Sequence, residues 1–136
     1  MITLKVRGLK NFKLDKKQYF PQVAPTTPIG LNDVASQIEK QSTVSLADIK
    51  GVLDALQEVV LEAMADGYSV RLGDLGSFRL TCTTTHGEDD PKLVTAKQVK
   101  KLRVRFTPSG AMQQKLGTAD ARTRSVTFSK IATPEA

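Results

Sequence analysis

The stretch VRLGDLGSFRL, from Val70 to Leu80, marks the point where the hydrophobic pattern of the chain changes its period. Before it, apolar residues recur every three or four positions, and after it they alternate with polar residues. This change predicts a helix followed by β-structure. Gly73 and Gly76 punctuate the stretch and favour a tight turn between two strands. The fold predicted around it is therefore α+β.

Two amphipathic helices are predicted before this point. The first covers about residues 32–41, with Asn32 as its N-cap. The second starts after Ser45, a suitable N-cap with Asp48 three residues later, and ends at Gly67, which suits the position after a helix. Its apolar stripe is wider than the short first helix can cover. Either a sheet or a second copy of the chain is expected to pack on it.

Short strands are predicted after Gly67. Residues 69–72 are followed by the turn, then by alternation at Phe78, Leu80 and Cys82. Because Cys82 falls on the apolar face, we expect a buried, unreactive thiol. The sequence HGEDDP indicates a turn at a tip, and strict alternation over 101–106 predicts a returning strand. A short helix is expected to start at Pro108 and Ser109 and to end near Gly117.

The two ends of the chain have their own predicted elements. Residues 2–7 and 19–23 favour strands, with a basic loop from Gly8 to Lys17 between them. Residues 24–30 resemble an extended linker, and residues 125–131 suggest a final strand before a frayed tail. We therefore predict three parts: a basic N-terminal extension over 1–30, a central domain over 31–117 and a C-terminal extension over 118–136.

Composition excludes several classes of protein. The 136 residues include one cysteine, so an intrachain disulfide is impossible and a cytoplasmic location is expected. No apolar run approaches the roughly 20 residues that cross a bilayer, so no membrane association is expected. His86 and Cys82 are too few for a zinc site. Neither a nucleophile elbow nor a phosphate-binding loop is present, so we expect no catalysis, cofactor, metal or small-molecule substrate.

Charge is distributed unevenly along the chain. The formal net charge is +6, with +5 over residues 1–30, −5 over 31–66 and +6 over 67–136. An acidic helical middle between basic ends suggests a surface that binds a polyanion. Charge that only keeps the protein in solution is the alternative explanation.

The segment with the strongest functional signal is residues 94–115, which hold six Lys or Arg and no acid. On a strand, Lys101, Arg103 and Arg105 would lie on one face at spacings of about 6.6–7 Å. That spacing is close to the distance between successive phosphates of a DNA strand. Neutralising phosphates releases counterions and gives affinity that does not depend on sequence. A solvated sheet face is again the alternative.

From Leu31 to Leu116 the sequence resembles the bacterial histone-like family of HU and integration host factor. The likeness rests on a short helix, a long helix ending in glycine, VRLGDLGSFRL, and the final VRFTPSGAMQQKL. The N-terminal VRGLKNFKLDKKQYFPQVA is similar to the HU-related branch of Bacteroidetes-type bacteria. The resemblance implies an intertwined homodimer with a shared helical base, an antiparallel sheet, an extended β-arm from each chain and extra terminal strands.

The resemblance also implies a partner, double-stranded DNA, bound in the nucleoid with little sequence preference through the backbone and the minor groove. It implies bending or compaction of the duplex, with a proline at the arm tip as a wedge between base steps. The residues proposed to contact DNA are Arg71, Arg79, Pro91, Lys92, Lys97, Lys100, Lys101, Arg103, Arg105 and Lys115.

The sequence departs from that family in three places. Glu88, Asp89 and Asp90 precede Pro91, where the family has basic residues. The final helix has Ser109-Gly110 and Gln113 where the family usually has lysines, and both ends carry additions. The acidic tip and the absent helix lysines favour an alternative in which an HU-like dimer serves as a protein–protein interaction module. An accessory domain of an enzyme is a third, weaker alternative.

Overall fold

The computed structural model describes residues 1–120, 122, 125–129 and 131, and these residues form two compact units. One unit comprises residues 29–113, and the other comprises residues 1–28 with the described residues from 114 onward. Helices and antiparallel sheets confirm the α+β prediction. The elements in chain order are β1 (Leu4–Asn11), β2 (Lys16–Val23), α1 (Leu31–Gln41), α2 (Leu46–Ala65), β3 (Val70–Arg71), β4 (Gly76–Thr84), the 3-10 turns η1 (Pro91–Leu93) and η2 (Ala96–Gln98), β5 (Val99–Pro108) and α3 (Gly110–Leu116).

The two long helices begin with different caps. Ser45 caps α2 as predicted, because its Oγ accepts a hydrogen bond from the Asp48 N–H at 3.3 Å. The prediction of Asn32 as the cap of α1 is wrong. Gly30 holds that position, and its N–H donates to Asp33 Oδ2 at 3.2 Å, so the acid three residues into the helix satisfies the backbone there.

After α2 the chain reverses into the three-stranded antiparallel sheet β3-β4-β5. Gly67 has a φ of +88°, which confirms it as the residue that ends α2. Gly76 has a φ of +149° and packs so closely on β5 that a Cβ would clash with the Thr107 carbonyl oxygen and lie 2.8 Å from the Phe106 ring. Only glycine therefore fits at the start of β4.

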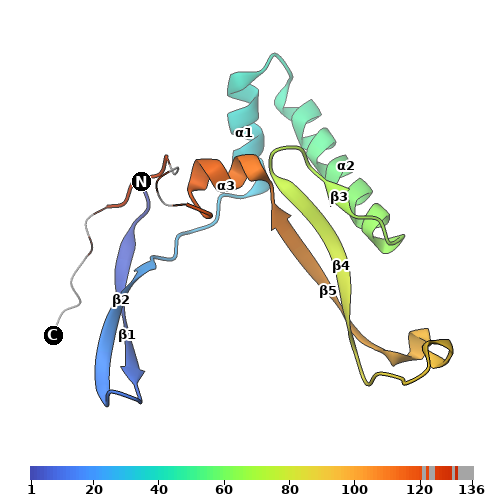
Figure 1. Cartoon of the computed structure of the whole chain (residues 1–136). Coiled ribbons are helices and arrows are strands. Elements are labelled where there is room, and N and C mark those ends of the chain that lie inside the picture. Colours follow the sequence, from blue (N-terminus) through green and yellow to red (C-terminus); the bar gives the residue numbers. More distant parts are fainter. Residues whose placement is uncertain (121, 123–124, 130, 132–136) are drawn as a thin grey trace. The chain divides into compact units, whose positions relative to one another are not determined.

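Strands β4 and β5 run out from the helical pair α1–α2 to a tip that carries η1 and η2 (Figure 1). Strand β5 begins at Val99 and ends at Pro108, so it is longer than the predicted 101–106. At the tip end the pairing skips Lys100, which makes a β-bulge between Thr83 and Thr84. The sheet is thus an extended two-stranded arm with β3 added at its foot.

The core of residues 29–113 is small for a single copy of the chain. Ala35, Ile49 and Met64 are the buried apolar residues among those described. On α2, by contrast, Val52 is 65% exposed and Val59 is 61% exposed. Much of the α2 stripe therefore has no cover within one chain. No helix in the described ranges is both long and apolar enough to span a bilayer.

The unit built from the chain ends is centred on the antiparallel hairpin β1–β2. The predicted loop from Gly8 to Lys17 is wrong at both ends, because β1 continues to Asn11 and β2 starts at Lys16. Cross-strand pairing from Leu4–Val23 to Asn11–Lys16 leaves only a four-residue turn. Basic residues that suggested a loop therefore lie on a strand.

The predicted final strand over 125–131 is not formed by the residues described there. Phe128 makes an isolated parallel bridge to Ile2, and the Ser129 N–H donates to the Ile2 carbonyl at 2.8 Å. Lys130, within the predicted strand, lies outside the described residues.

Just before this segment, hydrogen bonds from the side chain and backbone of Arg122 lower the pKa of Asp120 below its ordinary value.

Candidate nucleic-acid interface

Pairing across β3, β4 and β5 divides the sheet into two chemically different faces. Side chains alternate along each strand, and the observed register brings the polar positions of all three strands to one side. Every residue at these paired positions is basic or carries a hydroxyl. We call this surface the basic face, and it consists of Arg71, Ser77, Arg79, Thr81, Thr83, Lys101, Arg103, Arg105 and Thr107.

The cross-strand residue pairs of the basic face concentrate positive charge. Arg79 lies directly opposite Arg105, while Arg103 and Lys101 lie opposite threonines. Like charges directly opposite each other destabilise a strand pair. None of the ion pairs in the described part of the chain involves these bases. The face therefore holds unneutralised cations that an external anion would stabilise.

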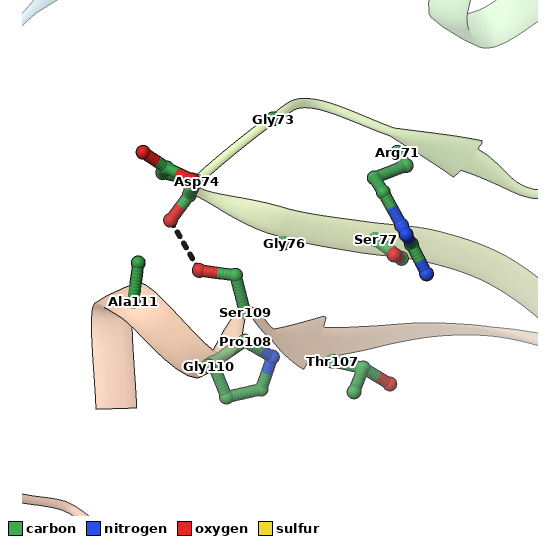
Figure 2. Close-up of a pocket in the computed structure, with 10 residues that line it drawn as sticks. All are labelled: Arg71, Gly73, Asp74, Gly76, Ser77, Thr107, Pro108, Ser109, Gly110 and Ala111. Carbon is green, nitrogen blue, oxygen red and sulfur yellow. Dashed lines mark hydrogen bonds between the residues drawn. The ribbon is translucent and has the colours of Figure 1, made fainter. Parts of the chain in front are cut away.

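A pocket of about 380 Å³ lies at the foot of the basic face (Figure 2). Arg71, Ser77 and Thr107 stand on three neighbouring strands and line it together. A guanidinium with two hydroxyls offers several hydrogen-bond donors to a phosphate oxygen. The foot of the basic face is thus suited to phosphate, as are the cross-strand pairs farther along the arm.

The turn before β4 fixes this pocket in place. Ser109 Oγ donates to the Asp74 carbonyl, a bond drawn in Figure 2, and the Ser109 N–H donates to the Leu75 carbonyl at 3.2 Å. The same Oγ accepts from the Met112 N–H at 3.0 Å. The GDLG turn is therefore tied to the junction of β5 and α3. Gly76 allows the close approach to β5, whereas Gly73 supplies the positive φ of +53° that the turn requires.

The acidic tip of the arm is held by internal hydrogen bonds. Glu88 Oε1 lies 3.1 Å from His86 Nε2, and Asp90 Oδ1 accepts from the Lys92 N–H at 3.0 Å. The Gln98 side chain, 7% exposed, accepts from the Thr95 N–H at 2.7 Å and donates to the His86 carbonyl at 3.1 Å. Two of the three tip carboxylates therefore help to order the turn.

The predicted contact residues divide into groups. Arg71, Arg79, Lys101, Arg103 and Arg105 share the basic face, whereas Pro91, Lys92 and Lys97 lie on the 3-10 turns at the exposed tip. Lys100 is the extra residue of the bulge. Lys115 falls in the unit formed by the chain ends.

The hydroxyl residues of the basic face were not among the predicted contact residues. Ser77, Thr81 and Thr83 alternate with apolar residues along β4, and Thr107 lies opposite Ser77 on β5. The signal that could have found them is their two-residue period in step with Arg79.

The opposite face of the sheet is apolar. Phe78 packs against Phe106, with ring centroids 5.1 Å apart. Farther along the arm, Leu102 is 60% exposed and Val104 is 64% exposed. The prediction that Cys82 is buried is wrong for a single chain, because the residue is exposed on this uncovered face.

A family model and several solved structures match the chain. The model described as HU-HIG, an HU domain fused to a winged helix-turn-helix, immunoglobulin or glycine-rich motif, matches residues 3–124. No curated protein matches.

Among solved structures, one from Bacteroides vulgatus, described as a bacterial DNA-binding protein, shares 18% identity at a TM-score of 0.57. That match covers 87% of this chain and 47% of the Bacteroides chain, so the present chain spans about half of that protein. An Anabaena HU protein crystallised with DNA shares 19% identity at a TM-score of 0.51, covering 65% of this chain and 97% of that one. An HU variant from Thermotoga maritima shares 20% identity at a TM-score of 0.49, covering 65% and 99%.

Proposed function

Because the chain belongs to the HU-HIG family, we propose that it is a histone-like protein that binds duplex DNA through the basic face, without catalysing a reaction. Membership of that family confirms the resemblance to HU proteins found in the sequence. The observation that carries the proposal is the composition of the basic face, where each position supplies a cation or a hydroxyl and none supplies a carboxylate.

Binding through this face would depend little on base sequence. The arginines and lysine sit at two-residue intervals, and hydroxyls fill the positions beside them. Such donors contact phosphates, which position a protein on DNA without reporting its sequence. The affinity should therefore fall steeply as salt rises, with a slope of about 0.9 per neutralised phosphate.

The active form in this proposal is a homodimer. Support comes from apolar surface that a single chain leaves open, on α2 at Val52 and Val59 and on the arm at Leu102 and Val104. An exposed area of this kind usually marks an interface. The HU-like fold also matches an HU protein that was crystallised with DNA. Two arms in one dimer would hold the duplex from two sides.

Bending of the duplex is proposed to depend on the tip. Pro91 is exposed there, and Leu93, two residues farther on in the same 3-10 turn, is 58% exposed. Apolar side chains of both kinds can wedge between base steps. Glu88 and Asp90 make hydrogen bonds within the tip, but these carboxylates and that of Asp89 keep their negative charge and oppose an approaching phosphate.

The test is a titration of labelled random-sequence duplex, followed by fluorescence anisotropy at about 50 and 200 mM salt. The variant Arg103→Gln/Arg105→Gln should bind at least tenfold more weakly per arginine, because each charged hydrogen bond contributes roughly 1.5–3 kcal/mol. Its salt slope should be shallower by about 0.9 for each lost contact. The matched control is Lys40→Gln/Lys50→Gln, which removes the same charge from exposed positions on α1 and α2.

Equal losses in the two variants would show that net charge, and not the basic face, governs binding. Absence of duplex binding by the unaltered protein at low salt would favour the alternative of a protein–protein interaction module. Weakened binding confined to the arm variant is the result that the proposal predicts.

A further inference from the structure

The N-terminal hairpin, β1 with β2 and the turn between them, carries a second basic surface and belongs to a different unit from the arm. We propose that this hairpin binds unpaired nucleotides of a nucleic-acid strand, with phosphates on its lysines and bases on its phenylalanine rings. The proposed site shares no residue with the basic face and goes beyond the duplex binding proposed above.

Charge on the N-terminal hairpin has little internal compensation. Residues 1–28 contain six Lys or Arg against Asp15 alone. Lys10 lies 3.9 Å from Asp15, and both side chains are mostly exposed. The register also places Lys10 directly opposite Lys17, a like-charge pair that destabilises a hairpin unless an anion neutralises it. A polyanion is therefore the complementary ligand.

Aromatic rings stand among these cations and face solvent. Phe12 is 86% exposed and Phe20 is 45% exposed. Lys10 Nζ lies 5.6 Å from the centroid of the Phe12 ring, and Lys17 Nζ lies 5.7 Å from that of Tyr19. Exposed rings beside cations are the combination with which proteins hold single strands, because every base has a face that can stack.

Phe12 and Phe20 line one pocket of about 450 Å³ at the turn end of the hairpin, together with Lys10 and Lys13. This volume lies within the range of about 300–1,000 Å³ that is typical of small-molecule sites. The open pocket therefore offers aromatic rings and the side chains of two lysines to one ligand.

Two amides give the same pocket hydrogen-bonding capacity. Asn11 Nδ2 donates to Gln18 Oε1 at 3.3 Å, and Asn11 Oδ1 accepts from the backbone N–H groups of Lys13 and Leu14 at 3.0 and 3.3 Å. The Asn11 amide is thus fixed, and Gln18 Nε2 is left to donate to the edge of a base.

The occupant follows from what each ligand class exposes. Bases in an intact duplex are stacked on one another, so the rings could not reach them. Insertion of Phe12 into a lipid surface would also bury the amides of Asn11 and Gln18, which line the same pocket, and burying amides is costly. Unpaired nucleotides, which expose both a base face and a phosphate, fit rings, amides and lysines together.

The test uses the full chain and a labelled oligothymidine, with a blunt duplex measured in parallel by anisotropy. The variant Phe12→Leu/Phe20→Leu should bind the single strand at least fivefold more weakly, because stacking on a ring contributes roughly 1–3 kcal/mol per base. Its duplex affinity should stay within twofold. The aromatic control is Tyr68→Leu, whose ring is 68% exposed in the other unit and should not matter for either ligand.

A second variant, Lys13→Gln, leaves the rings and the strands intact and should reduce the single-strand salt slope by about 0.7. The reverse experiment is Arg103→Gln/Arg105→Gln, which should weaken duplex binding far more than single-strand binding. If Arg103→Gln/Arg105→Gln binds duplex as tightly as the unaltered protein while the Phe12→Leu/Phe20→Leu variant still loses single-strand affinity, the proposed function is contradicted and the hairpin site is supported.

Three results would overturn this inference. The first is single-strand affinity of Phe12→Leu/Phe20→Leu within twofold of the unaltered protein. The second is an equal loss for single strand and duplex, which would make the hairpin part of one common site. The third is that the protein sediments with phosphatidylserine vesicles and loses this binding in Phe12→Leu/Phe20→Leu, while oligonucleotide binding is the same in the variant and the unaltered protein.

Discussion

The arm β4–β5 and the N-terminal hairpin β1–β2 are both antiparallel, two-stranded and basic, yet they present their charge differently. On the arm, cations share one face with hydroxyls, and apolar residues are confined to the other. On the N-terminal hairpin, the exposed rings of Phe12 and Tyr19 lie beside the cations of Lys10 and Lys17. The basic face of the arm is thus suited to phosphates, and the hairpin to phosphates with bases. In the two proposals the neighbouring side chains, more than net charge, distinguish the ligands.

The apolar faces differ as well. The arm leaves Leu102 and Val104 uncovered in a single chain, and the same is true of Val59 on α2. The proposed partner copy would cover α2, whereas the N-terminal hairpin needs no partner for its pocket.

Val59→Asp should abolish the dimer at micromolar concentration. The side chain is 61% exposed in one chain, so the carboxylate is harmless there, but an unpaired charge buried in a dimer costs several kcal/mol. The mass measured by sedimentation should halve and duplex affinity should fall, while single-strand affinity stays within threefold. Lys50→Asp, an exposed change on the same helix, is the control. A Val59→Asp protein that remains dimeric contradicts the proposed interface.

Gly76→Ala should destabilise residues 29–113 by about 3 kcal/mol, through the unfavourable φ and the clash with the Thr107 carbonyl. The free energy of unfolding in urea measures the change. Gly87→Ala, where a Cβ meets nothing within 4 Å, should stay within about 0.5 kcal/mol. Similar stability of the two variants would mean that the turn does not fix the foot of the arm.

Arg79→Gln should have opposite effects on stability and binding. Removing one of two opposed arginines should raise the free energy of unfolding by about 0.2–1 kcal/mol, while duplex affinity falls about tenfold. Arg7→Gln on the N-terminal hairpin, opposite Phe20, is the comparison and should leave both quantities unchanged. If Arg79→Gln lowers stability, the pair is not under electrostatic strain in the free protein.

Much of the fold could be predicted from local signals. The apolar stripe of α2, Ser45 before it and Gly67 after it are encoded within a few residues, and the structure confirms them. The prediction of Asn32 as the cap of α1 was wrong because the Asp33 carboxylate accepts a hydrogen bond from the Gly30 N–H. The spacing of apolar residues alone does not decide which of the neighbouring positions is the cap.

The parts that depend on pairing were harder to predict. Basic residues between Gly8 and Lys17 suggested a loop, yet cross-strand partners extend both strands into it. The lysine and arginines of β5 were predicted to share a face from alternation alone, and alternation also groups Thr81 and Thr83 with Arg79 on β4. That Thr81 lies opposite Arg103, and Thr83 opposite Lys101, depends on the register. Register between distant segments is not visible in local periodicity.

The most direct test of the basic face is a lysine-reactivity footprint by mass spectrometry, with and without a saturating random-sequence duplex. The account predicts strong protection of Lys101 on the basic face, with Lys40 on α1 and Lys50 on α2 unchanged. Lys101 that reacts equally in free and fully bound protein would contradict it.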